Sequence, residues 1–201
     1  MKSLHSCIIL ASVLSALLTG CANVTPTRFY TLSPQPDDAA TQQASATTAT
    51  IGIGPIDFPR LLERPQLVTR TSPNEVHLAE FHQWGGSLKE EFARVLVDNL
   101  AARTRAPLHR HPWESRIRPD YQVLITLDRF DGTLGDTLVL RGQWQIVAVA
   151  RREVLRTERI LLETPLADTR YATYAAGMSR SVARLADQIA AGLAEHAGAV
   201  R

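Results

Sequence analysis

The residues with the clearest chemical potential stand at the end of a short apolar segment near the N-terminus. Lys2 provides a basic start, an apolar run interrupted by two serines extends from Cys7 to Leu18, and Thr19-Gly20-Cys21 follows. A basic start, a short apolar middle and small residues at the cut are the layout of a secretory signal. The run is shorter than the ~20 residues that a membrane-spanning helix needs. The pattern therefore predicts a cleaved secretory signal with the cut just before Cys21.

The sequence Leu18-Thr19-Gly20-Cys21 resembles the lipobox of bacterial lipoproteins, in which the cysteine becomes the first mature residue and carries acyl groups. The resemblance implies a cleaved signal peptide over residues 1–20, lipidation of Cys21 and a lipid-anchored tether over 21–27. One acyl chain binds a membrane only marginally, whereas the three chains typical of such a cysteine give a stable anchor. The alternative is an ordinary signal peptide with a chance cysteine, although ordinary sites favour Ala-x-Ala before the cut.

Two pairs of histidines are the candidate metal ligands of this sequence. His109 and His111 are two residues apart, so on a strand they would face the same side, and His77 and His82 are five apart. No carboxylate stands at a supporting distance in the sequence, which a metal site of this kind would need. We expect these histidines to be ordinary surface or loop residues, and we expect no metal and no cofactor.

Patterns for catalysis are weak as well. The carboxylate pair Asp37-Asp38 lies in a low-complexity segment, and Glu90-Glu91 lies on the polar face of a predicted helix. General acid–base catalysis needs carboxylates in different environments of one cleft. Gly52-Ile53-Gly54 lacks the spacing of a dinucleotide-binding loop, and it is better read as a strand whose glycines allow close approach. We therefore expect no enzymatic activity.

Composition limits the class of protein. The chain has 201 residues, 22 basic and 20 acidic, with a net charge of +2, which is not the basic footprint of a nucleic-acid-binding protein. Its hydrophobic content of 45% is ordinary for a globular protein, and the length after cleavage suits one domain. If Cys7 is lost with the signal, Cys21 is the only cysteine left and no disulfide can form.

The elements that must position any site follow from periodicity. The sequence predicts strands over 28–32 and 50–56, separated by a flexible low-complexity loop over 34–50. Two strands over 66–71 and 75–80 form a predicted hairpin. Further predicted strands cover 121–127, 137–151 and 154–163, with a turn near Asp131-Gly132.

Two helices complete the pattern. Ser87 is a predicted N-cap with Glu90 three residues later, and the helix runs to about Arg105. The second helix covers 174–197. Their apolar stripes are Leu88, Phe92, Val95, Leu96 and Leu100, then Met178, Val182, Leu185, Ile189 and Leu193. The fold class predicted is α+β, a single compact domain over 28–201 with a mostly antiparallel sheet packed against two main helices.

Trp84 has two interpretations. It precedes Gly85-Gly86 and lies outside the predicted strands and helices, so it could contact a partner or a lipid. The favoured alternative is a core tryptophan that covers the start of the first helix.

An ordered series of short motifs extends from Cys21 to about Leu100. Its members are Arg28-Phe29-Tyr30-Thr31-Leu32-Ser33-Pro34, Arg64-Pro65-Gln66-Leu67-Val68-Thr69-Arg70, His82, Trp84, Leu88, Phe92-Ala93-Arg94-Val95-Leu96 and Asn99-Leu100. In order and spacing, the series resembles the ABC-type transport auxiliary lipoproteins, the PqiC (YmbA) family. Gly85-Gly86-Ser87 departs from the family's more usual polar-acidic-proline run before the helix.

The resemblance implies a non-catalytic, periplasm-facing lipoprotein of the outer membrane of a Gram-negative bacterium. Such a protein works with an MCE-domain protein and an ABC permease and ATPase complex in intermembrane lipid transport, which supports envelope integrity. Phospholipid and further copies of the chain are additional expected partners, and nucleic acid is not. Ala22 agrees with this location, because an Asp after the lipidated cysteine favours retention in the inner membrane in enteric-type sorting. The alternative is an assembly or structural lipoprotein of other envelope machinery.

The same resemblance implies a set of partner-interaction residues. They are Arg28, Tyr30, Arg64, Pro65, Gln66, Arg70 and Trp84. For the arginines and the glutamine, the structural alternative is that they secure a turn framed by prolines.

Overall fold

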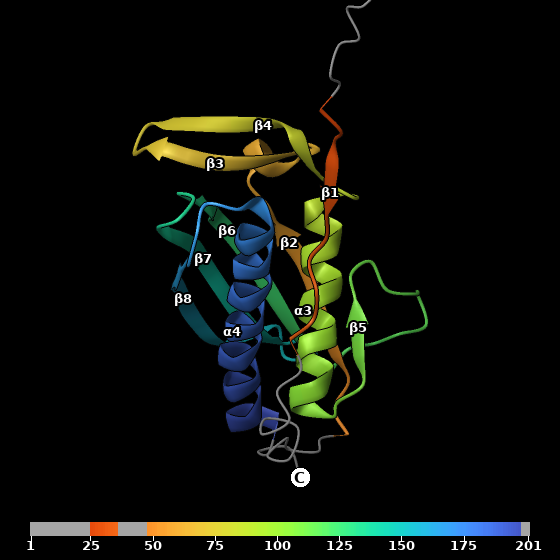
Figure 1. The fold of residues 1–201 in the computed structure, drawn as a ribbon. Helices are drawn as coiled ribbons and strands as arrows, with labels where there is room; N and C mark the ends of the chain where they lie inside the picture. Colours follow the sequence, from red (N-terminus) through yellow and green to blue (C-terminus); the bar gives the residue numbers. More distant parts are fainter. Residues whose placement is uncertain (1–24, 36–47, 198–201) are drawn as a thin grey trace, which may run out of the picture.

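A computed structural model describes residues 25–35 and 48–197 (Figure 1). Cys21, the predicted signal peptide and most of the predicted loop over 34–50 lie outside the described residues. Within the described ranges the chain forms two mixed sheets and two α-helices, α3 (Leu88–Thr104) and α4 (Tyr171–Ala197), with a short 3-10 helix η1 (Arg60–Leu62). The predicted α+β class is confirmed.

The five-stranded sheet has the order β5-β2-β6-β7-β8. Its strands are β2 (Ile51–Asp57), β5 (Leu108–Arg110), β6 (Tyr121–Gly132), β7 (Thr137–Ala148) and β8 (Glu153–Pro165). The long strands β6, β7 and β8 form an antiparallel meander, while β2 pairs in parallel with both β5 and β6.

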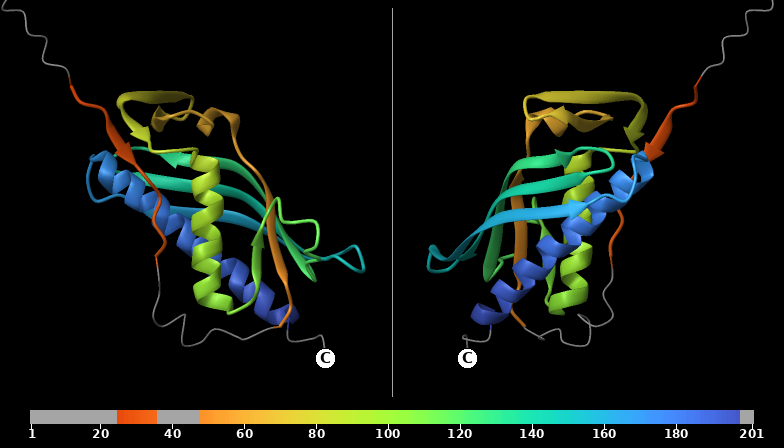
Figure 2. Two further views of the ribbon diagram at one scale, coloured as in Figure 1. Left: turned by 90° about the vertical axis from the view of Figure 1, so that its right-hand side faces the viewer. Right: turned by 60° about the vertical axis from the view of Figure 1, so that its left-hand side comes forward.

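The three-stranded sheet has the order β1-β4-β3, with β1 (Arg28–Tyr30), β3 (Gln66–Ser72) and β4 (Glu75–Trp84). Strands β3 and β4 form the predicted hairpin, and β1 pairs with β4 in parallel. This small sheet lies across the end of the molecule where both helices begin, and α4 ends at the opposite end (Figures 1 and 2).

Both helices cover one face of the five-stranded sheet (Figure 2). The predicted apolar stripes of both helices are buried, as are the alternating residues of the strands, Tyr121, Val123, Ile125, Leu127, Leu138, Leu140, Trp144, Ile146 and Ala148. Phe92 of α3 makes edge-to-face contacts with Phe58 and Phe130, with ring centroids 5.7 and 5.6 Å apart. Hydrophobic burial at period 3.6 in the helices and period 2 in the strands therefore builds one core.

Several details differ from the sequence prediction. Strand β5 was not predicted, because three residues carry no measurable alternation. Strand β6 continues to Gly132, beyond the predicted end at 127, after an irregularity near Leu127, and the predicted turn near Asp131-Gly132 follows directly over 133–136. Helix α4 begins at Tyr171 rather than 174, and the parallel pairings of β1 and β2 were not predicted.

The hydroxyl of Tyr174 joins three elements at the small-sheet end. It accepts a hydrogen bond from the Gly132 N–H of β6 at 3.0 Å and donates one to the Val68 carbonyl of β3 at 2.8 Å. The side chain is buried, so neither backbone group has water to replace this partner. Burial and the Asp131 charge raise the pKa of the phenol, which keeps Tyr174 neutral and able to donate.

We expect Tyr174→Phe to lower the free energy of unfolding by about 1–3 kcal/mol, because two buried backbone groups lose their partner. Tyr121→Phe is the matched control, since the Tyr121 hydroxyl makes one 3.3 Å bond to the His196 carbonyl. Urea unfolding followed by circular dichroism measures both. Equal losses in the two variants would contradict the role assigned to Tyr174.

Candidate functional site

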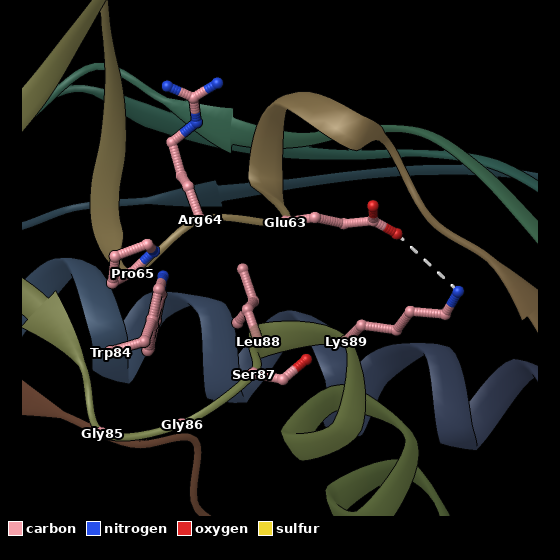
Figure 3. A pocket seen from close by; sticks show the side chains of 9 residues that line it. All are labelled: Glu63, Arg64, Pro65, Trp84, Gly85, Gly86, Ser87, Leu88 and Lys89. Atoms are coloured by element: carbon pink, nitrogen blue, oxygen red, sulfur yellow. Dashed lines mark ion pairs between the residues drawn. The ribbon is translucent and has the colours of Figure 1, made fainter.

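A hollow of about 390 Å³ opens beside the start of α3, between the residue pair that follows η1 and the segment that links β4 to α3 (Figure 3). Its lining is Glu63, Arg64, Pro65, Trp84, Gly85, Gly86, Ser87, Leu88 and Lys89. Three of the sequence-predicted interaction residues, Arg64, Pro65 and Trp84, therefore meet at one place.

Backbone hydrogen bonds fix the tryptophan wall of the hollow. The Trp84 N–H donates to the Pro65 carbonyl at 2.7 Å, and the Gly85 N–H donates to the Tyr30 carbonyl at 2.8 Å. Trp84 lies at the end of β4 and is only 4% exposed, as is typical of core tryptophan, and Leu88 is buried beside it. The Trp84 indole and the Leu88 side chain form an apolar wall of the hollow. The backbone hydrogen bonds to Pro65 and Tyr30 hold this wall in place.

The rim of the hollow is charged. Lys89 Nζ lies 3.8 Å from Glu63 Oε1, and both side chains are about 40% exposed, so the pair contributes little to stability. Arg64 donates from Nε to the Leu61 carbonyl at 2.7 Å, and Figure 3 shows its guanidinium directed away from the hollow. The Ser87 hydroxyl accepts from the Glu90 N–H as the cap of α3. An apolar wall with a polar rim suits a contact surface for an apolar group better than it suits acid–base chemistry.

An aromatic stack adjoins the hollow through β1. The hydroxyl of Tyr30 lies 2.7 Å from Nδ1 of His82, and the His82 ring stacks on Tyr171 with centroids 4.0 Å apart. Tyr171 is the first residue of α4, so the stack joins β1, β4 and α4. Burial first, and the nearby Arg28 second, lower the pKa of His82, which favours the neutral ring within the stack.

Arg70 lies apart from the hollow and makes a structural contact. Its Nε and Nη2 donate to the buried carboxylate of Asp131 at 2.7 and 3.1 Å, and Arg129 Nε donates to the same carboxylate at 2.6 Å. The hydrogen bonds to Asp131 raise the pKa of Arg70. The arginine therefore joins the small sheet to β6, a contact between elements distant in sequence that differs from the expected securing of a proline-framed turn.

The remaining predicted residues lie along the small sheet. Tyr30 belongs to the aromatic stack, Arg28 is exposed opposite His82, and Gln66 pairs with Gln83 across the β3–β4 ladder. The lipidation site Cys21 lies outside the described residues. Sequence reasoning missed Lys89 and Glu63 of the rim and Asp131 of the ion-pair network. For Asp131 a signal existed, since Arg129-Phe130-Asp131 places opposite charges on either side of a core phenylalanine.

A family model described as "ABC-type transport auxiliary lipoprotein component" matches residues 30–190, well over half of the chain. The chain belongs to this family. The family resemblance stated from the motifs is thereby confirmed, and the match includes the hollow, the aromatic stack, α3 and α4 as far as residue 190.

Solved structures of low sequence identity share the fold of this auxiliary lipoprotein. An uncharacterized protein matches with a TM-score of 0.69 at 17% identity, covering 84% of this chain and 99% of its own. A protein from Xanthomonas campestris, assigned to family DUF330, matches with a TM-score of 0.68 at 15% identity, covering 86% and 97%. A hypothetical protein from Chlamydia trachomatis reaches 0.50 at 12% identity, covering 75% and 98%. No curated protein matches the sequence.

Within residues 25–35 and 48–197, neither helix is long and apolar enough to cross a bilayer. In the same described ranges no group of three or more His, Cys, Asp or Glu side chains is placed to hold a metal ion.

The stack predicts a pH dependence of stability. Because the pKa of His82 is lowered in the folded state, the unfolded chain binds a proton more readily, and stability falls as the pH drops below about 6.5. We expect the melting temperature to fall between pH 7 and pH 5, and to fall less in His82→Gln. His77→Gln, at an exposed position of the same strand, is the control and should keep the full decrease. Identical pH profiles for all three proteins would contradict the assignment.

Proposed function

We propose that this protein is an outer-membrane lipoprotein that faces the periplasm and acts, without catalysis, as the auxiliary component of an MCE/ABC-type system. Such a system moves lipids between the two membranes and supports envelope integrity. The observation that carries the proposal is the family match over residues 30–190, directly downstream of a lipobox-like Leu18-Thr19-Gly20-Cys21. The family resemblance also predicts that the protein binds phospholipid and forms a homo-oligomer, and both remain predictions.

The position of the first strand supports an anchored module. The tether over 21–27 spans at most about 25 Å when fully extended, so an acylated Cys21 keeps β1 close to the membrane. Strand β1 is hydrogen-bonded to β4 next to the hollow. The contact surface for an MCE-domain partner would then be the hollow between Pro65 and Trp84, with its charged rim at the side.

The anchor is tested by fractionation. We expect Cys21→Ser to release the protein from the membrane fraction, because the thiol that would carry the acyl chains is lost. Cys7→Ser is the matched control, since it changes a cysteine inside the predicted signal, and it should leave the protein in the outer membrane. Ala22→Asp should shift the protein toward the inner membrane. Unchanged membrane association of Cys21→Ser would contradict lipidation.

The partner is tested by affinity purification of the tagged protein from membranes. We expect an MCE-domain protein and a permease to copurify, and Lys89→Glu to reduce their recovery at least several-fold by reversing the charge at the rim. Arg116→Glu is the control, because Arg116 is exposed in the loop after β5, away from the hollow lining. Recovery of only peptidoglycan-associated or barrel proteins would favour an assembly or structural role in other envelope machinery.

A further inference from the structure

The phenylalanines divide into two groups with different surroundings. Phe58, Phe92 and Phe130 are buried, and Phe92 contacts both of the other rings. Phe29 of β1 is 65% exposed and Phe81 of β4 is 43% exposed. Exposing two large aromatic side chains to water is costly in free energy unless another surface covers them.

The two exposed rings lie on neighbouring strands at the β1 edge of the small sheet. Phe29 is in register with Gln83 of β4, so these two side chains share one side, and Phe81 stands two residues before Gln83, in the stretch between Leu78 and Gln83 where the register of β4 with β3 shifts. The opposite side carries Tyr30 and His82, which contact each other inside the molecule. We name the set Phe29, Phe81 and Gln83 the outer patch.

The outer patch lies at the end of the chain that the anchor would hold. Phe29 is eight residues from Cys21, so the two are separated by no more than about 30 Å of extended chain. Helix α4 leads away from this end over 27 residues, about 40 Å, and Figures 1 and 2 show its last turn at the opposite end. An acylated Cys21 would therefore hold the outer patch within about 30 Å of its attachment point, at the end of the domain opposite the last turn of α4.

From these observations we infer that the outer patch rests on the phospholipid leaflet, with Phe29 and Phe81 inserted between headgroups. The inference rests on the lipid anchor in the proposed function and deepens it by assigning the surface that touches lipid. Two rings are a small area for a stable protein interface, which needs about 800 Å² per partner, whereas a tethered domain needs only a local apolar contact.

The charges near the outer patch fix the kind of lipid contact. Arg28 precedes Phe29 and Glu80 precedes Phe81 in the sequence; both are exposed and carry opposite charges, and Gln83 is neutral. The patch therefore offers no net attraction for anionic headgroups, and its contact is apolar. We expect the contact to be insensitive to salt, in contrast with a basic patch on an anionic membrane.

The test uses the full lipidated protein in vesicles of phosphatidylethanolamine and phosphatidylglycerol. Cys21 is the only cysteine of the predicted mature chain and is acylated, so Gln83→Cys introduces a single free thiol for an environment-sensitive fluorophore. Gln143→Cys is the matched control on the exposed face of β7. We expect iodide quenching of the label at 83 to fall at least two-fold on the vesicles, at low and high salt, while quenching at 143 stays unchanged.

A second variant tests the role of the rings. Replacing both phenylalanines, Phe29→Ser with Phe81→Ser, should restore quenching at 83, whereas Val154→Ser, which removes an exposed apolar residue of β8, should not. Equal quenching at 83 and 143 in protein that floats with the vesicles overturns the lipid contact and leaves the anchor intact. Protein that does not float with the vesicles overturns the anchor and, with it, this inference.

Discussion

The buried carboxylate of Asp131 is the constraint on which the relation of the two sheets depends. An unpaired charge at this depth would be strongly destabilising, so β6 must meet cations there. Arg129 comes from the same strand, but Arg70 comes from β3, and its two hydrogen bonds hold the small sheet against the large one. The Tyr174 hydroxyl reinforces the same junction from α4. The ion pairs to Asp131 and the hydrogen bonds of Tyr174 to the backbone thus fix one arrangement of the two sheets. Hydrophobic contact alone would let the small sheet shift relative to the large one.

That junction determines what the small sheet can present. With β3 held at Asp131, β4 delivers Trp84 to the hollow and His82 to the stack, while β1 is added along its other edge. The inner side of the small sheet therefore packs against the rest of the domain, and its outer side is exposed. In the proposed function, this one three-stranded sheet would separate the surface for a protein partner from the surface for lipid.

Much of the fold was predictable because it follows from local rules. Helix α3 has a serine cap and an apolar stripe, and β7 alternates over its whole length, so both were predicted from neighbouring residues alone. What could not be predicted depends on partners distant in sequence. The burial of Trp84 depends on its backbone hydrogen bond to Pro65 and on the packing of β1 beside it. The continuation of β6 depends on the ion pair between Arg70 and Asp131. Strand β5 forms because it pairs with the edge of β2. For the candidate site, the motifs identified Arg64, Pro65 and Trp84, but the acidic and basic rim residues became visible only in three dimensions.

The parallel pairing of β1 with β4 has a mechanical consequence. Chain tension from a membrane anchor would enter at the first residue of β1 and act along the strand (Figure 2). Tension in that direction strains the hydrogen bonds of the β1–β4 ladder together, as in shear, instead of opening them one after another from an end. A three-residue strand can therefore withstand a pull that would readily peel it off from the side, and a domain anchored as proposed would move relative to its membrane without unfolding.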